Sequence, residues 1–449
     1  MQDSKHHHQE QPRGGDKWNL NFGIMNMRQY RHDISALLML ATALLLIACS
    51  SDEVTPPTAT PITLGASVQD AAVTRNGANG CINYSALARS NYGFGVYAFG
   101  TKEWTNKQVT YQGSETNPVS ELGDVHVHPG NWFYDTEEDW TSTDNISFLA
   151  YAPYVSAGSG NTGIKSITAS GVDNTTIDYG VANTLANSVD LLWGVKGKTG
   201  KPWLNTTLSM TGGPVIFTFH HALAAIGFHV QAMIDKENNE DDLEDESGVV
   251  GILGTSAKIT IESVTVTGPF YSGGTLNLNN STANTPNWTS KTPATPSSTE
   301  MTLSVANGDI EDALRYHSDK TAADLFLTEN ASITGVTQTA QQLLLKRQDG
   351  IEQCFFVLPN AAQDYTVTLN WYVSGKNTSG AYVAKQHTST MTVKDWQLKH
   401  DTKYYLNFII GLKTVKFDIT AEDWQGDPQD VSVLIEHGTS ANSSLAPRR

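Results

Sequence analysis

The fold of this chain is decided by the stretch Tyr365-Thr366-Val367-Thr368-Leu369-Asn370-Trp371-Tyr372-Val373. Large apolar side chains occupy every second position, which is the period of a β-strand with one face against a core. The segment Tyr404 to Leu412 repeats this alternation, with Leu406, Phe408 and Ile410 in phase. We therefore predict an all-β protein with almost no helix.

Shorter alternating runs extend the pattern toward the N-terminus. Residues 62–68, 94–99 and 146–153 each have the length of a single strand, and Asn76-Gly77 is a turn signal behind the first of them. In that first run, the side chains predicted to share one face are Ile62, Leu64, Ala66 and Val68.

The run Val215 to Val230 changes its apolar phase from odd to even positions. We predict one strand that changes face at a bulge between His220 and Ala225. Residues 258–266 carry a second change of parity, and we expect these two runs to pair as a hairpin. Between them, eight carboxylates stand from Asp235 to Glu246, so residues 235–247 are predicted to be a solvated acidic loop.

Two later segments interrupt the β pattern. Residues 272–307 are rich in Ser, Thr, Asn and Pro and are predicted to be a loop. Residues 309–317 have a spacing compatible with one short helix.

The N-terminal part has the layout of a secretory signal. Arg28 and Arg31 precede an apolar segment, residues 37–47, that is too short for an ordinary membrane-spanning helix. The sequence that follows, Leu46-Ile47-Ala48-Cys49, resembles the lipobox of bacterial lipoproteins, in which the cysteine is acylated and becomes the first mature residue. The alternative is a chance cysteine in an apolar run.

These features give the expected order of the chain. Residues 1–24 are interpreted as a start-site or cloning artefact, 25–48 as the lipoprotein signal peptide, and 49–61 as a proline-containing lipidated tether. A mature chain of about 400 residues is too long for one ordinary core. We predict an N-terminal domain over 62–212, a C-terminal domain over 213–437 and a loose tail over 438–449.

Composition limits the classes of partner. The formal net charge is −17, so binding to a phosphate backbone has no electrostatic support and nucleic acid is not expected. Paired catalytic acids, nucleophile elbows and phosphate-binding loops are not recognisable in the sequence, so we expect neither an enzyme nor a cofactor.

Histidines and cysteines are the side chains in this sequence that could bind a metal, act in catalysis or form a disulfide. His126 and His128 share one predicted strand face, but no third ligand accompanies them, so a solvated face is favoured over a metal site. His220 and His221 have no acid or nucleophile at a recognisable spacing and are interpreted as structural. The cysteines other than Cys49 are Cys81 and Cys354. They lie far apart in the sequence, and we expect two separate buried thiols, with pairing left open.

Tryptophan side chains could either bind sugars by stacking or pack in the core. Trp132, Trp140 and Trp193 fall in or near predicted strands. Aromatic side chains in β-rich proteins usually pack in the core, and sugar stacking is the less favoured interpretation.

Taken together, the order of short motifs resembles the fimbrillin family of Bacteroidota lipoprotein pilins. The motifs that carry the resemblance are the lipobox, the first strand, Val73-Thr74-Arg75, residues 146–153, Asp190-Leu191-Leu192-Trp193-Gly194, Phe219-His220-His221-Ala222-Leu223-Ala224, Phe356-Val357-Leu358-Pro359 and a closing strand that ends in aspartate and tryptophan. The resemblance implies two transthyretin-like β-sandwich domains in tandem. It also implies a structural or adhesive subunit of a fimbria at the outer-membrane surface, whose partners are other fimbrial subunits, a maturation protease and the membrane through the lipid anchor.

The family resemblance further implies a mechanism of assembly. A trypsin-like protease would cut after Arg75, the strand over 62–68 would leave, and a strand from the next subunit would fill the groove that Ile62, Leu64, Ala66 and Val68 had capped. An unpaired strand edge beside an apolar groove is a template for such an added strand. The alternative is a monomeric surface lipoprotein that binds glycans or host proteins and is never cut, with Arg75 an ordinary surface arginine in a turn.

Overall fold

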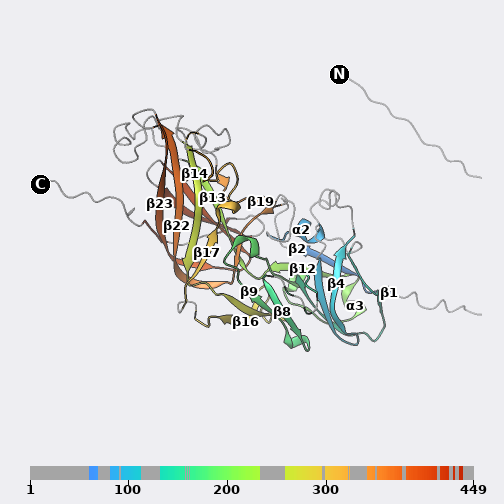
Figure 1. Ribbon diagram of the computed structural model, residues 1–449. Coiled ribbons are helices and arrows are strands. Elements are labelled where there is room, and N and C mark those ends of the chain that lie inside the picture. The colour runs from blue at the N-terminus through green and yellow to red at the C-terminus, as the bar shows by residue number, and fades with distance from the viewer. Residues whose placement is uncertain are drawn as a thin grey trace, which may run out of the picture. The chain divides into compact units, whose positions relative to one another are not determined.

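β-strands carry the fold. In the computed structural model, 60% of the described residues lie in strands, with a few short helices and several sheets (Figure 1). The prediction of a β fold is confirmed, and the tandem pair of sandwiches stays a prediction. The structure describes residues 60–68, 81–89, 93–112, 132–156, 158, 160, 162–232, 258–295, 299–321, 323, 341–348, 351–376, 381–411, 415–423, 428–429 and 434–437.

The N-terminal strands form a sheet that closes on itself. Its members, in hydrogen-bonded order, are β10 (Leu192–Lys196), β12 (Val215–His221), β2 (Leu64–Val68), β5 (Trp132–Tyr134), β4 (Trp104–Tyr111), β3 (Phe94–Gly100), β7 (Ile146–Ala152) and β11 (Trp203–Thr206). The far end of β7 also pairs with β10, which closes the ring. Every pairing in it is antiparallel except β2 with β12. The two-residue strands β1 (Thr60–Pro61) and β6 (Asp139–Trp140) pair separately.

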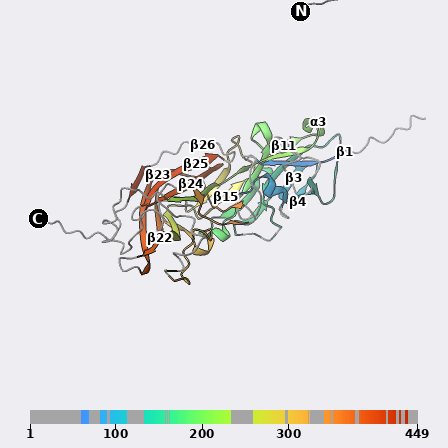
Figure 2. The same cartoon turned by 90° about the horizontal axis from the view of Figure 1, so that it is seen from above.

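The C-terminal strands form two sheets. One has the order β18 (Gln342–Leu343), β13 (Ala224–Ala232), β24 (Thr402–Ile410), β25 (Val415–Asp423) and β26 (Pro428–Gln429), with β21 (Phe355–Val357) also on β13. The other has the order β17 (Met301–Val305), β14 (Lys258–Gly268), β22 (Asn360–Lys376), β23 (Tyr382–Leu398) and β27 (Leu434–His437). Figure 2 shows β24 and β25 running alongside each other.

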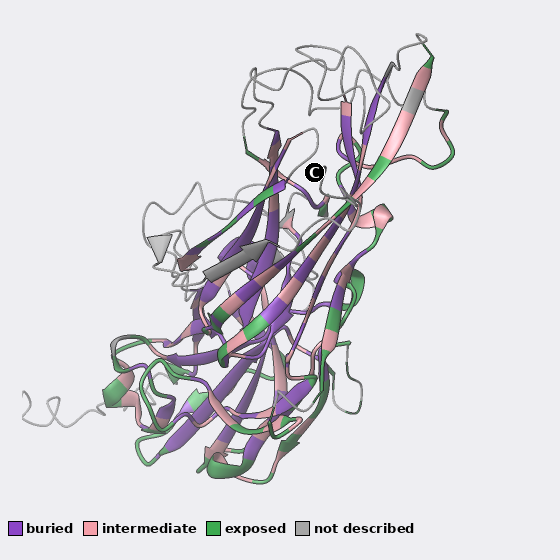
Figure 3. Ribbon diagram, turned by 90° about the vertical axis from the view of Figure 1, so that its left-hand side faces the viewer, coloured by how far each residue is buried: buried purple, intermediate pink, exposed green. Residues whose placement is uncertain are grey.

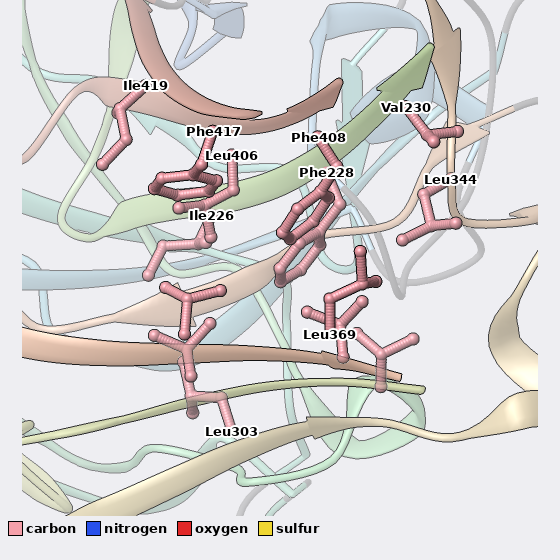
Figure 4. Close-up of a cluster of buried hydrophobic side chains, with 14 of the residues drawn as sticks. Ile226, Phe228, Val230, Leu303, Leu344, Leu369, Leu406, Phe408, Phe417 and Ile419 are labelled. Carbon is pink, nitrogen blue, oxygen red and sulfur yellow. The ribbon is translucent and has the colours of Figure 1, made fainter. Parts of the chain in front are cut away.

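The apolar faces of these two sheets share one core. Phe228 and Phe408 of one sheet stack with ring centroids 6.5 Å apart, and they belong to the same buried cluster as Leu303 and Leu369 of the other (Figure 4). The residues that alternate in the stretch that opened the sequence analysis, Tyr365 to Val373, lie in this core. Figure 3 shows the resulting change between buried and more exposed positions along the strands.

A smaller sheet joins segments from both halves of the sequence. Its order is β16 (Asn287–Thr292), β15 (Gly273–Asn277), β9 (Thr175–Gly180) and β8 (Ile164–Ala169). The prediction of a loop over 272–307 was therefore wrong, because β15, β16 and β17 lie within it. Strand formation there depends on pairing with β9 and β14, which composition does not reveal.

The break in the run 215–230 has a different cause from the one predicted. β12 ends at His221 and β13 begins at Ala224, and the two strands belong to different sheets. The apolar phase changes because the chain crosses between sheets, so a single bulged strand was wrong. The predicted hairpin of this run with 258–266 was also wrong, since β14 pairs with β17 and β22. The register of β14 does shift between Ile261 and Ser263, so the second bulge is confirmed.

Helices are short and few among the described residues. They are α2 (Tyr84–Arg89), α3 (Leu208–Thr211) and the single-turn segments η2 (Val172–Asn174), η3 (Leu185–Asn187), η4 (Gly197–Thr199) and η6 (Asn307–Asp309). The helix predicted over 309–317 was wrong, because Ile310 and Arg315 instead make isolated β-bridges. The remaining small pair is β19 (Arg347–Gln348) with β20 (Ile351–Glu352). No described helix is long and apolar enough to cross a membrane.

Candidate functional site

The first long strand, β2, is built into the interior of the closed sheet. On one side it runs parallel to β12, from Leu64 opposite Val215 to Val68 opposite Phe219. On its other side the ladder with β5 contains Leu64 opposite Trp132. An early strand of the chain therefore lies between two strands, β5 and β12, that come much later in the sequence.

Side chains of β2 and its lead-in fill the core of this sheet. Ile62, Leu64, Ala66 and Val68 are all buried, and Leu64 has no exposed surface. The core around them is aromatic, since the ring centroids of Phe94 lie 5.1 Å from those of Trp132 and 5.8 Å from those of Phe217. Large apolar side chains on one face of a central strand stabilise the sheet by burial.

Polar contacts fix the start of this segment. The Ile62 N–H donates to the backbone oxygen of Glu138 at 2.7 Å, and the Tyr134 hydroxyl donates to the Ile62 carbonyl oxygen at 2.7 Å. Burial raises the pKa of Tyr134 to about 12, so the hydroxyl remains a donor at neutral pH. The Val215 N–H donates to the Thr63 carbonyl oxygen at 2.9 Å. This role of Tyr134 could not be predicted from the sequence, because Tyr134 lies far along the chain from Ile62.

The segment 81–89 follows β2 and also makes a polar contact outside it. The Ile82 N–H donates to Asp190 Oδ2 at 3.0 Å, and Asp190 is fully buried. Tyr84 and Leu87 of α2 lie in the same apolar core as β2. The described chain is thus tied down on both sides of residues 69–80.

Asp190 also belongs to a buried cluster of histidines and aspartates. His221 Nδ1 lies 2.8 Å from Asp190 Oδ2, and both side chains are fully buried. The His221 N–H donates to Asp401 Oδ1 at 2.7 Å, while His220 Nδ1 lies 3.1 Å from Asp401 Oδ2. The two histidines do have acid partners, contrary to the prediction, because Asp190 and Asp401 come close to them only in the folded chain. These contacts join the segment before β10, the strand β12 and the turn before β24, and the interpretation of the two histidines as structural stays a prediction.

Electrostatics keep Asp401 ionised. Burial alone would raise the pKa of its carboxyl group, but hydrogen bonds to His220 and His400 outweigh burial and hold the pKa below its usual range. The carboxylate therefore remains an acceptor for the His221 N–H over the whole neutral range. The side chain of Asp401 is 25% exposed, so water reaches it from one side.

Several predicted site residues lie outside the described residues. These are Cys49, Arg75, His126, His128 and the acidic segment 235–247. Among the residues that the structure does describe, no group of three or more His, Cys, Asp or Glu side chains could hold a metal ion.

The aromatic residues weighed as sugar-binding groups are in the core. Trp132, Trp140 and Trp193 are buried, and Trp193 packs against His220 with ring centroids 5.4 Å apart. Within the described part of the chain, the exposed large hydrophobic side chain is Met210, at 50% exposure. These three tryptophans therefore offer no exposed platform for a sugar.

The two cysteines are not separate, contrary to the prediction. Cys81 Sγ and Cys354 Sγ lie 3.7 Å apart, with Cys354 buried and Cys81 partly exposed. The prediction relied on their distance in sequence, but in the folded chain Cys81 packs against the same apolar cluster that contains Cys354.

Comparison with solved structures connects this arrangement to a known fold. No family model matches the sequence, and no curated protein matches it. A crystal structure of a fimbrial protein from Bacteroides vulgatus matches with a TM-score of 0.52 and 18% sequence identity, over 81% of this chain and 99% of that chain. The chain has a fimbrillin-like fold.

Two further structures lie at larger distance from this fimbrillin-like chain. A candidate cell adhesion protein from Bacteroides uniformis matches with a TM-score of 0.34 and 14% identity, over 81% of this chain and 98% of that chain. A candidate adhesin from Bacteroides ovatus matches with a TM-score of 0.27 and 11% identity, over 82% of this chain and 99% of that chain.

Proposed function

We propose that this chain is a structural or adhesive subunit of a cell-surface fimbria. It is exported as a lipoprotein through Cys49, cut after Arg75 and assembled by donor-strand exchange. The observation that carries the proposal is the position of β2, an early strand whose apolar face is buried between β12 and β5. The fold shared with the fimbrial protein from Bacteroides vulgatus supports it.

Loss of β2 has a definite physical consequence. The backbone of Val215 to Phe219 in β12 would lose its parallel partner, and the aromatic core beside Phe94 and Trp132 would open to water. An apolar groove with an unpaired strand edge is strongly favourable for an incoming strand, which restores the main-chain hydrogen bonds and refills the pockets at alternate positions.

The cut leaves the rest of the sheet in place. Arg75 precedes the segment that begins at Cys81, and this segment is held by the Ile82 hydrogen bond to Asp190 and by the burial of Tyr84 and Leu87. The part upstream of Arg75 contributes β2 as one removable element, while the part downstream remains anchored.

A C-terminal strand is the expected donor. β27 stands at the end of its sheet order and pairs with β23 from Met391 to Lys394. An edge strand near the chain terminus can be released with the loss of one ladder, whereas a central strand would break two. To reuse the ladder of β12, the donor has to run parallel to β12, as β2 does.

Location and partners follow from this scheme. The acyl chains on Cys49 hold the precursor at a membrane, the mature subunit lies in a fimbrium at the outer-membrane surface, and its partners are other fimbrial subunits and the maturation protease. The fold shared with the fimbrial protein from Bacteroides vulgatus is consistent with a surface role.

N-terminal sequencing of protein sheared from the cell surface tests the proposal. We expect a mature chain that starts at Asn76 and runs as heat-resistant ladders on gels. A chain that starts at Cys49 and runs only as a monomer would contradict the proposal and would favour the monomeric lipoprotein that binds glycans or host proteins.

A further inference from the structure

Cys81 and Cys354 lie side by side although 273 positions separate them in the sequence. Their sulfur atoms are 3.7 Å apart, which is contact distance, and a disulfide requires an approach to about 2.0 Å. The remaining movement is smaller than the reach of a cysteine side chain that rotates about its Cα–Cβ bond.

Both cysteines are held where they meet. Cys81 directly precedes Ile82, whose N–H donates to the buried Asp190 at 3.0 Å. Cys354 directly precedes β21, in which Phe355 pairs with Ile226 of β13. Because the two neighbouring backbones are fixed by independent contacts, the proximity of the sulfur atoms belongs to the fold.

The surroundings distinguish the two thiols. The hydrogen bond with Cys81 and then burial raise the pKa of the Cys354 thiol well above its usual value, so this thiol stays protonated as long as Cys81 is a free thiol. Cys81 is partly exposed and is therefore the thiol that an external disulfide can reach. The positive charge of Lys403 acts in the opposite direction on the pKa of Cys354, since it favours the Cys354 thiolate that attacks during exchange.

We propose that Cys81 and Cys354 form a disulfide bond in the exported protein. The proposal rests on the proposed function in one respect, which is that export brings the protein into an oxidising compartment. The oxidant is a disulfide donor, such as an oxidised dithiol oxidoreductase in the cell or glutathione disulfide in solution. Cys81 attacks the donor and forms a mixed disulfide, Cys354 then attacks the sulfur of Cys81, and the donor leaves with the two electrons and the two thiol protons as two thiols.

The bond has a consequence for assembly. Cys81 lies six positions after Arg75, so it would belong to the new N-terminal segment of the cut subunit. A covalent link from there to the residue before β21 would confine the opening to the part upstream of the cut. The segment 81–89 could then not follow β2 out of the sheet.

Thiol mapping on the full chain tests the disulfide. Protein harvested from the cell surface is alkylated in denaturant, digested without reductant and analysed by mass spectrometry. We expect a linked pair of peptides that contain Cys81 and Cys354, with no alkylation at either and with separation after reduction. Full alkylation of both cysteines in the harvested protein would overturn the proposal.

The purified, reduced chain gives a second measurement, independent of the compartment. Incubation with glutathione disulfide should remove both reactive thiols and raise the thermal unfolding midpoint, and the Cys81→Ser variant should show no such rise. Free thiols at Cys81 and Cys354 that persist in the wild-type chain would count against the pair geometry itself.

The N-terminus of the same harvested sample separates the two proposals. A linked pair in a chain that still begins upstream of Arg75 would support the disulfide and contradict the cut. Alkylated cysteines in a chain that begins at Asn76 would overturn the disulfide and leave the cut standing.

Discussion

The substitution Leu64→Ala separates a strand that leaves from a strand that stays. Leu64 has no exposed surface and sits opposite Val215 and Trp132 in the core of the closed sheet. Truncation of a large buried side chain to alanine lowers the free energy of unfolding by about 2–5 kcal/mol, and the loss is larger at sites where the surrounding residues cannot close the cavity. Because rigid aromatic rings surround this site, we expect about 3–5 kcal/mol in the uncut protein.

The matched control is Leu192→Ala. Leu192 is the same residue type, lies in the same buried cluster and has no exposed surface, but it belongs to β10, which remains after the cut. Both variants should therefore weaken the uncut protein by similar amounts. In assembled polymers, Leu192→Ala should still lower stability, whereas Leu64→Ala should have no effect, because the strand that carries it has gone.

Two assays make the comparison. Urea unfolding followed by tryptophan fluorescence, in an uncut Arg75→Ala background, gives the change in the free energy of unfolding. The temperature at which ladders dissociate on gels gives the stability of the polymer. Polymers of Leu64→Ala that dissociate as early as those of Leu192→Ala would refute the reasoning, since β2 would then still be present.

Cys49→Ala should yield protein that fractionates as soluble or unprocessed, since the acyl chains are its membrane anchor; metabolic lipid labelling that survives the substitution would contradict this. Arg75→Ala should abolish polymers while it changes stability by less than about 0.5 kcal/mol, because the sequence predicts a surface turn there; gels that show normal ladders would remove the cut from the scheme. Asp401→Asn should destabilise the protein at neutral pH. The folded-state pKa of Asp401 is lowered, so its contribution is complete above the unfolded value of about 3.9 and is lost as the pH falls through the folded value. Urea unfolding of the wild type and the variant should accordingly converge at low pH, and a difference that does not vary with pH would count against an ionised Asp401.

The alternation of side chains was sufficient to predict strands. Tyr365 to Val373 lies within β22 and Tyr404 to Ile410 within β24, because an apolar side chain at every second position can face a core only in an extended chain. The face of β2 was readable for the same reason, and Ile62, Leu64, Ala66 and Val68 are all buried. Local period is a property of the sequence itself.

Partners of strands were beyond the sequence. The run over 272–307 looked like a loop because its composition is polar, yet β15 gains its strand from pairing with β9, far earlier in the chain. The change of phase at Ala222 looked like a bulge because a bulge and a crossing between two sheets leave the same local pattern. Propensity is a weak guide where the neighbouring strand supplies the hydrogen bonds.

The sequence by itself determined that this chain is β-rich, which face of its first strand is apolar, and where a signal and a cleavable arginine are expected. Only the tertiary structure decided what those residues meet. β2 lies beside β12, with Ser67 and Thr218 in contact across 151 positions, Asp190 and Asp401 flank His221, and Cys81 reaches Cys354. Side-chain period is fixed by neighbours along the chain. Pairing is fixed by the burial of apolar faces that are distant in sequence, and only the folded molecule brings those faces together.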